Sequence, residues 1–139
     1  MKNKLYFNIK DKTTQNDAFN AIVNEQETIG YYSLPDQDIE PIKSYCKTIP
    51  KKIKTIAVVG IGGSSLGAKA VYEFIASTKK LKRELYFFEG TDPLDITNTL
   101  SKMDLKTTHF LIISKSGTTV ETFSVYKYIY SQLDDPKHY

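Results

Sequence analysis

The chain has 139 residues, 40% of them apolar and 12% aromatic, and its 19 basic and 16 acidic residues give a formal net charge of +3. This composition suits one globular core rather than a disordered chain, and the scattered lysines argue against a nucleic-acid partner. No apolar stretch is long enough for a signal peptide or a membrane span, so we expect a cytoplasmic protein without a membrane partner.

The segment before Lys51 predicts two helices around a turn. The helices are expected over Asn16–Glu27 and Ile39–Thr48, and the Gly and Pro of "GYYSLPD" mark the turn between them. Cys46, the only cysteine, cannot form an internal disulfide and has no C-x-x-C partner for zinc. We therefore expect Cys46 to be a packed small residue and predict no metal site.

Three uninterrupted apolar runs follow, at Ile56–Gly60, Leu85–Phe88 and Phe110–Ile113, and each predicts a β-strand. None shows the polar alternation of a one-sided sheet, so we expect all three strands to be buried on both faces. The gaps of about 25 to 30 residues suit βαβ crossovers. The pattern predicts an α/β fold with a parallel sheet.

Apolar residues at helical spacing predict a helix after the first strand and another after the third, each with one stripe facing the sheet. The stripes are Leu66, Ala70, Val71, Phe74 and Ile75 in one helix and Val120, Phe123, Tyr126, Tyr130 and Leu133 in the other. A shorter helix is predicted over Pro93–Met103, with Asp92 as its N-cap.

Two Gly/Ser-rich loops, "GIGGSSLG" (60–67) and "SKSGTT" (114–119), each leave a strand and open a helix. Open α/β sheets bind ligands at this edge, and helix N-termini favour anions because their first amides are unpaired. We therefore predict neighbouring loops that bind a phosphate. The alternative is structural: Thr118 to Glu121, "TTVE", fits a capping box.

Two nucleotide-binding motifs come close to this sequence. For a mononucleotide P-loop, Lys69 is displaced by one position. For a dinucleotide fingerprint, Gly60 and Gly62 follow a strand and Glu89 ends the next, but Ser65 occupies the third glycine position. The hydroxyl cluster after the third strand favours a phosphate site over a dinucleotide-binding domain.

The segments "VVGIGGSSLGAKAVYE" and "LIISKSGTTVET" resemble the amino-terminal sugar-isomerase (SIS) domain of the glucose-6-phosphate isomerase, or phosphoglucose isomerase, family. The first loop is specific to this family, whereas the second is shared with other sugar-phosphate isomerase and regulatory domains. The resemblance implies a three-layer, flavodoxin-like, doubly wound parallel sheet with helices on both faces, incomplete in this chain. Residues 1–50 would form a helical segment, and residues 51–139 the first part of the domain.

The resemblance also implies which residues bind the substrate phosphate. They are Gly63, Ser64, Ser114, Lys115, Ser116, Gly117, Thr118 and Thr119. Gly117 stands where many members carry a bulky residue, which we interpret as subfamily variation. Ser65 replaces an aspartate that is common in the family, so no contact is assigned to its side chain.

The implied reaction interconverts glucose 6-phosphate and fructose 6-phosphate in glycolysis and gluconeogenesis, without a cofactor, in an enzyme that is a homodimer at full length. The family's catalytic residues lie beyond the matched region, and Glu121, His109 and His138 do not correspond to them. We therefore assign no catalytic residue and expect this chain alone to be inactive. The alternatives are a stand-alone SIS module that binds or senses a sugar phosphate, and a dinucleotide-binding domain.

Overall fold

The computed structural model describes residues 11–25 and 28–133, and the chain divides into two compact units, Met1–Ser44 and Tyr45–Tyr139. The first unit contains helix α1 (Lys12–Asn24) and the 3-10 helix η2 (Gly30–Asp36), which forms over the predicted turn. Helix α1 begins four residues before the predicted start, and residues 26–27 of the prediction lie outside the described residues. Helix α2 (Glu40–Thr48) joins the two units.

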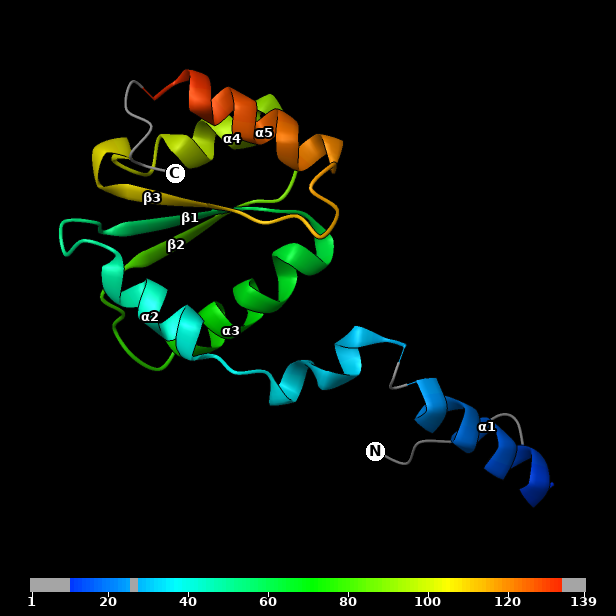
Figure 1. The fold of residues 1–139 in the computed structure, drawn as a ribbon. Helices are drawn as coiled ribbons and strands as arrows, with labels where there is room; N and C mark the ends of the chain where they lie inside the picture. Colours follow the sequence, from blue (N-terminus) through cyan, green and yellow to red (C-terminus); the bar gives the residue numbers. More distant parts are fainter. Residues whose placement is uncertain (1–10, 26–27, 134–139) are drawn as a thin grey trace. The chain divides into compact units, whose positions relative to one another are not determined.

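The second unit is built on a parallel sheet of β1 (Thr55–Val59), β2 (Glu84–Phe88) and β3 (Thr108–Ile112), as Figure 1 shows. The strand order is β2-β1-β3, so β1 is central. In the register of the sheet, Thr55 of β1 lies opposite Glu84 of β2 and Thr108 of β3. The three predicted strands and their parallel arrangement are confirmed.

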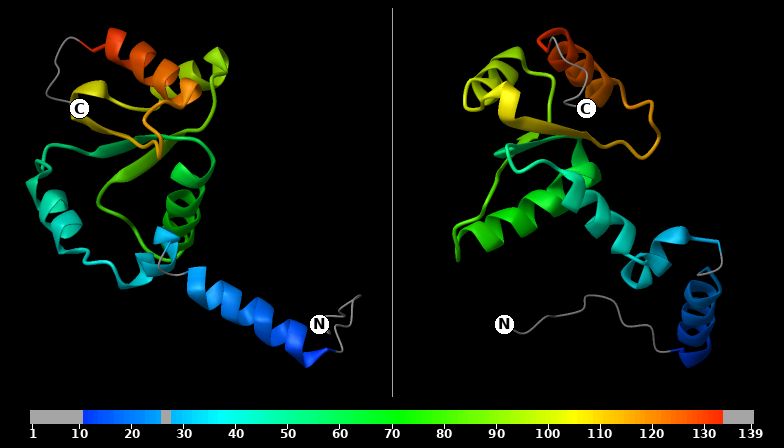
Figure 2. Two further views of the ribbon diagram at one scale, coloured as in Figure 1. Left: turned by 45° about the vertical axis from the view of Figure 1, so that its right-hand side comes forward. Right: turned by 60° about the vertical axis from the view of Figure 1, so that its left-hand side comes forward.

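Helices cover both faces of the sheet. Helix α3 (Leu66–Ala76) lies on one face, and α4 (Pro93–Leu100) and α5 (Val120–Ser131) lie on the other (Figures 1 and 2). Two short 3-10 helices, η3 (Gly62–Ser64) and η4 (Leu105–Thr107), precede α3 and β3. The result is the three-layer α/β sandwich expected from the sequence.

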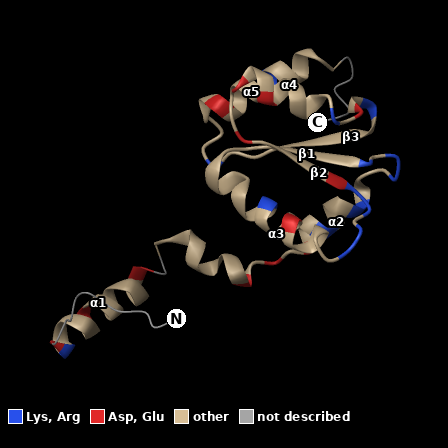
Figure 3. Cartoon of the chain, turned by 180° about the vertical axis from the view of Figure 1, so that it is seen from behind, with Lys and Arg blue, Asp and Glu red and all other residues tan. Residues whose placement is uncertain are grey.

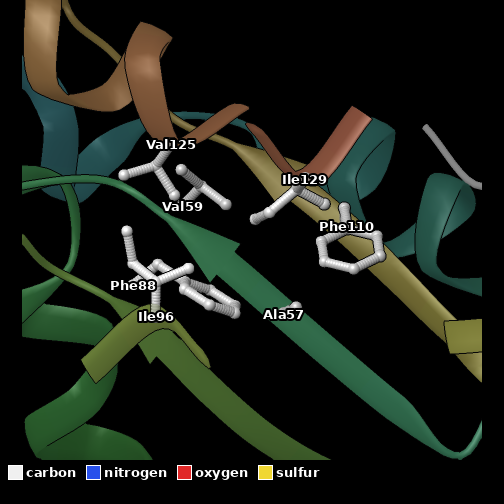
Figure 4. Packing of buried hydrophobic residues seen from close by; sticks show 7 residues of the cluster. All are labelled: Ala57, Val59, Phe88, Ile96, Phe110, Val125 and Ile129. Atoms are coloured by element: carbon white, nitrogen blue, oxygen red, sulfur yellow. The ribbon is translucent and has the colours of Figure 1, made fainter. Parts of the chain in front are cut away.

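The larger hydrophobic cluster fills the space between the sheet and helices α4 and α5 (Figure 4). Its buried members are Ala57, Val59, Phe88, Ile96, Phe110, Val125 and Ile129. Alternate residues of β1 point the other way, and Ile56 and Val58 pack there with Ile53. On that face the Tyr72 ring of α3 lies 6.3 Å from the Phe87 ring. Each face of β1 therefore has its own core.

The prediction that all three strands are buried on both faces is wrong for β2 and β3. All five residues of β1 are buried, whereas Leu85, Tyr86 and Phe87 of β2 are only partly buried and Ile112 at the end of β3 is exposed. The reason is position, because β2 and β3 are the outer strands and only β1 has neighbours on both sides.

The predicted apolar stripes are also mostly wrong about which side of each helix packs, although Leu133 of the second stripe does pack against the larger cluster. In α3, Leu66 and Phe74 are 59% and 74% exposed, and Tyr72 packs on the sheet instead. In α5, Val120 is 72% exposed, whereas Val125 and Ile129 are buried. Both helices carry apolar residues on more than one side, so helical spacing alone does not select the buried one.

Of two further local predictions, one is confirmed and the other is wrong. Asp92 caps α4 as predicted, since its Oδ1 accepts a hydrogen bond of 2.8 Å from the Leu94 amide. Cys46 is exposed, so its expected packing is wrong. Across residues 11–25 and 28–133, no helix has the length and apolar character needed to cross a membrane.

Candidate functional site

The two Gly/Ser-rich loops meet beside Gly60, at the carboxyl edge of the sheet. The Gly60 amide bonds to the Phe88 carbonyl of β2 at 3.2 Å, and the Ile113 amide bonds to the Val59 carbonyl of β1 at 2.9 Å. A Cβ atom placed on Gly60 would lie 3.0 Å from the Ile113 carbonyl oxygen and 3.1 Å from the Ser64 Cβ. The first loop and the start of the second loop are therefore neighbours, as predicted.

The first loop is a tight turn that leads into α3. Gly62 has a φ of +59°, in the left-handed region that favours glycine. The Ser64 amide bonds to the Ile61 carbonyl and the Ser65 amide to the Gly62 carbonyl, at 3.2 and 3.1 Å. This turn places Gly63 and Ser64 directly before the N-terminus of α3.

Ser65 is the N-cap residue of α3, yet its side chain makes no capping hydrogen bond. Its hydroxyl is fully buried and donates to the Glu89 Oε1 atom at 2.9 Å. The other carboxylate oxygen of Glu89 forms an ion pair of 2.5 Å with the Lys69 ammonium group. Sequence reasoning assigned no contact to Ser65, and the structure shows that it joins α3 to the end of β2.

The ion pair favours the charged form of both partners. The Lys69 hydrogen bond lowers the pKa of Glu89, although partial burial of the carboxylate acts in the opposite direction. The Glu89 carboxylate in turn raises the pKa of Lys69. Because each group is held by the other, this arrangement does not support Lys69 as a P-loop lysine or Glu89 as a ribose ligand.

The second loop contains a cluster of hydroxyl groups bonded to one another. The Ser114 Oγ lies 3.0 Å from the Thr119 Oγ1, and the Thr118 hydroxyl donates to the Ser116 Oγ at 3.1 Å. Ser114 and Ser116 also accept bonds from the amides of Gly117 and Thr118, at 3.1 and 3.2 Å. These contacts gather four of the predicted hydroxyl groups at the start of α5.

Gly117 has a structural reason to be glycine, because its φ of +70° lies in the left-handed region. Three other loop residues named as ligands, Lys115, Ser116 and Thr118, are exposed. Beside the loop, a hollow runs along α5. It is lined by Ile112, Ser114, Gly117, Thr119, Thr122, Phe123 and Tyr126.

The predicted capping box at the start of α5 is wrong. The N-cap is Thr119 rather than Thr118, so Glu121 is the second helical residue and not the third that the motif requires. The Thr119 hydroxyl is engaged with Ser114 and makes no capping bond. The carboxylate of Glu121 still stands in the first turn of α5, where the helix dipole favours it.

The helices at the carboxyl edge differ in how they begin. Helix α4, which follows β2, is capped by the Asp92 carboxylate. Helices α3 and α5, which follow the adjacent strands β1 and β3, receive no side-chain cap from their N-cap residues Ser65 and Thr119. The two uncapped helix starts therefore belong to the same two loops that carry the hydroxyl groups.

Apart from Lys69 and Lys115, the basic groups nearest the sheet lie at its opposite edge. Figure 3 shows that the lysine-rich connections enter β1 and β2 at their opposite, amino-terminal ends. Arg83 there donates to the carbonyls of Ile49, Pro50 and Ile53, so it stabilises the connection into the sheet.

His109 does not belong to the candidate site either. His109 lies on β3, with its Nε2 2.8 Å from the Tyr45 hydroxyl, and His138 lies outside the described residues. No cluster of potential metal ligands occurs in the described part of the chain.

The fold and these loops define an open parallel α/β domain with a candidate anion-binding edge between two adjacent strands. The sequence profile of phosphoglucose isomerase matches residues 38–136. The chain belongs to the phosphoglucose isomerase family.

Relatives with assigned names support this membership. The chain is 36% identical to glucose-6-phosphate isomerase of Campylobacter jejuni over 131 residues, which cover 91% of this chain and 32% of that protein. It is 48% identical to the Desulfotalea psychrophila enzyme of the same name over 68 residues, 49% of this chain and 13% of that protein. The chain thus spans about a third or less of these relatives' lengths.

A solved structure shows the same fold. A hypothetical protein from Thermus thermophilus superposes with a TM-score of 0.70 over 84% of this chain and 28% of that chain, at 24% sequence identity. This similarity supports the α/β architecture and says nothing about the ligand.

Proposed function

We propose that this chain is part of an aldose–ketose isomerase that interconverts glucose 6-phosphate and fructose 6-phosphate, and that this part binds the substrate phosphate. One observation carries the proposal: helices α3 and α5, which follow the adjacent strands β1 and β3, begin without a side-chain cap beside loops rich in glycine and hydroxyl groups. Membership of the phosphoglucose isomerase family supports the sugar phosphate as ligand.

The chemistry of the two loops suits a phosphate that must be released after each turnover. Unpaired helix amides and neutral hydroxyl groups donate to the phosphate oxygens, and the helix dipoles add positive potential. Each hydrogen bond to a charged acceptor contributes about 1.5 to 3 kcal/mol, so several are needed for useful affinity. The proposed ligands are Gly63, Ser64, Ser114, Lys115, Ser116, Gly117, Thr118 and Thr119.

The proposal places proton transfer elsewhere in the enzyme. Isomerisation needs a base between C1 and C2 and positive charge near the developing enediolate. Glu121 lies in the first turn of α5 and His109 beside Tyr45, and we assign neither to the reaction. In this proposal residues 51–139 form the first part of a sugar-isomerase domain in a cytoplasmic, homodimeric, cofactor-free enzyme, and this chain alone has no turnover.

A titration followed by amide NMR shifts tests the binding step. Inorganic phosphate and fructose 6-phosphate should shift the amides of 62–68 and 114–121, and NAD should not. Ser114→Ala should weaken binding by about 1 to 3 kcal/mol. Ser131→Ala is the matched control, because that hydroxyl donates to the Tyr128 carbonyl in the last turn of α5, far along the helix from the loop. Shifts centred on Lys79–Arg83, or equal affinity in Ser114→Ala, would contradict the proposed site.

A coupled assay for fructose 6-phosphate conversion tests the separation of binding from catalysis. The chain should show no activity above a mock-purified background while it still binds phosphate. Measurable turnover would refute this separation and would make Glu121 the first residue to substitute. Binding of NAD in place of sugar phosphate would instead support a dinucleotide-binding domain.

A further inference from the structure

We propose that Glu89 is a positioning residue for the phosphate site. Its carboxylate holds the Ser65 hydroxyl away from the first turn of α3, and this leaves the α3 amides open to the phosphate. The inference rests on the proposed function, because it explains how one half of that site stays available.

Ser65 does not make the hydrogen bond that its position at the start of α3 would allow. A serine at an N-cap position ordinarily accepts a hydrogen bond from the second or third helical amide. Ser65 is the N-cap of α3 and makes no such bond. Its hydroxyl, fully buried, instead points to Glu89 at 2.9 Å and lies 3.3 Å from the Gly62 carbonyl oxygen. The bond to Glu89 therefore fixes the hydroxyl in an orientation in which it does not cap the helix.

The position of Glu89 is fixed from two sides. One carboxylate oxygen accepts from Ser65, and the other pairs with Lys69 at 2.5 Å. Lys69 belongs to the first turn of α3, and its amide bonds to the Ser65 carbonyl at 2.9 Å. The three residues form a closed ring that ties the end of β2 to the start of α3, so the carboxylate cannot turn away from Ser65 without losing the ion pair.

Lys69 also neutralises the negative charge of Glu89 beside the proposed phosphate site. An unpaired carboxylate beside an anion site would repel the ligand, whereas the Glu89–Lys69 pair carries no net charge. Glu89 can thus orient Ser65 without lowering the affinity for phosphate.

The experiment compares Glu89→Ala with Glu89→Gln. Both substitutions remove the carboxylate charge and with it the ion pair to Lys69, but glutamine keeps a hydrogen-bond partner for Ser65 and alanine does not. In Glu89→Ala the released hydroxyl should cap α3 and compete with the ligand. We expect phosphate to bind Glu89→Ala about fivefold more weakly than Glu89→Gln, the factor set by one hydrogen bond of ordinary net strength.

The double substitution Ser65→Ala/Glu89→Ala is the sharper measurement. It removes the competing hydroxyl, so affinity should return to within about twofold of Glu89→Gln. A merely structural role for Glu89 predicts the opposite, because a second deletion in one network does not restore binding. Equal affinities for Glu89→Ala and Glu89→Gln, or a double variant as weak as Glu89→Ala, would overturn the inference.

Two further measurements keep the result interpretable. Thermal unfolding confirms that each variant is folded at the titration temperature, and Glu89→Leu, which fills the space and also lacks an acceptor, replaces Glu89→Ala if that variant is unfolded. Ser114→Ala reports on the proposed function separately. If wild type does not bind phosphate, both proposals fail. If Ser114→Ala weakens binding while the two Glu89 variants agree, only the positioning role fails.

Discussion

Replacement of Gly60 by alanine should both destabilise the protein and weaken phosphate binding, because Gly60 lies where the two loops meet. The added Cβ atom would sit 3.0 Å from the Ile113 carbonyl oxygen and 3.1 Å from the Ser64 Cβ. Ordinary van der Waals contacts begin at 3.4 Å, so both neighbours would have to move by a few tenths of an ångström. Neither neighbour is the end of a flexible side chain, so the movement must displace backbone.

The magnitude follows from overpacking. Extra methyl groups forced into a tightly packed site cost about 1 to 3 kcal/mol. The free energy of unfolding falls by about 1 to 3 kcal/mol per molar urea. A loss of about 2 kcal/mol of stability therefore lowers the urea concentration at the unfolding midpoint by about 1 M. The same displacement would move Ser64 and the start of the second loop apart, so affinity for inorganic phosphate should fall as well.

Gly90→Ala is the matched control. Gly90 lies two residues beyond the end of β2, and a Cβ atom there would have no neighbour within 4 Å and its φ is not left-handed. It should change the unfolding midpoint little or raise it slightly, since alanine restricts the unfolded chain. A Gly60→Ala variant with wild-type midpoint and wild-type phosphate affinity would refute the close approach of the two loops.

Three further predictions concern stability and can be checked by urea unfolding. Ile129→Ala, which removes a fully buried side chain, should cost about 2 to 5 kcal/mol, whereas Val120→Ala at 72% exposure should cost under about 0.5 kcal/mol. Asp92→Ala removes the cap of α4 and should cost about 0.5 to 2 kcal/mol; no loss would show that the cap is replaced. Because the folded pKa of Glu89 is lowered, its contribution is complete above the unfolded pKa, about 4.3, and is lost as pH falls through the folded value. Wild type should therefore exceed Glu89→Gln in stability at about pH 7, and the difference should shrink at about pH 3.

The sheet could be predicted from the sequence because a central parallel strand leaves a continuous apolar run. The buried faces of the helices could not be predicted from the sequence. Helical spacing in α5 predicts that Val120 and Phe123 face the sheet, yet Val125 and Ile129 are the residues that pack against it. Both sets recur at helical intervals, and only the tertiary arrangement selects between them. Tyr126 and the exposed Phe123 instead line the hollow beside the second loop.

The same limit applies to the candidate site. The hydroxyl groups of the second loop are close in sequence, so their clustering was visible in the residue pattern alone. The contact between Ser65 and Glu89 joins residues 24 positions apart and depends on β2 lying beside β1. The sequence pattern suggested only one role for Glu89, that of a ribose ligand. Its bonds to Ser65 and Lys69 do not favour that role.

The two halves of the proposed site therefore stay open for different reasons. In the second loop, Ser114 and Thr119 bond to each other, so the hydroxyl that could cap α5 is engaged by a residue five positions away. In the first loop, Ser65 is engaged by a carboxylate on another strand. A local arrangement survives changes elsewhere in the fold, whereas the first loop depends on the register between β1 and β2. Substitutions that shift β2 should consequently reduce phosphate binding through the first loop while leaving the hydroxyl cluster of the second intact.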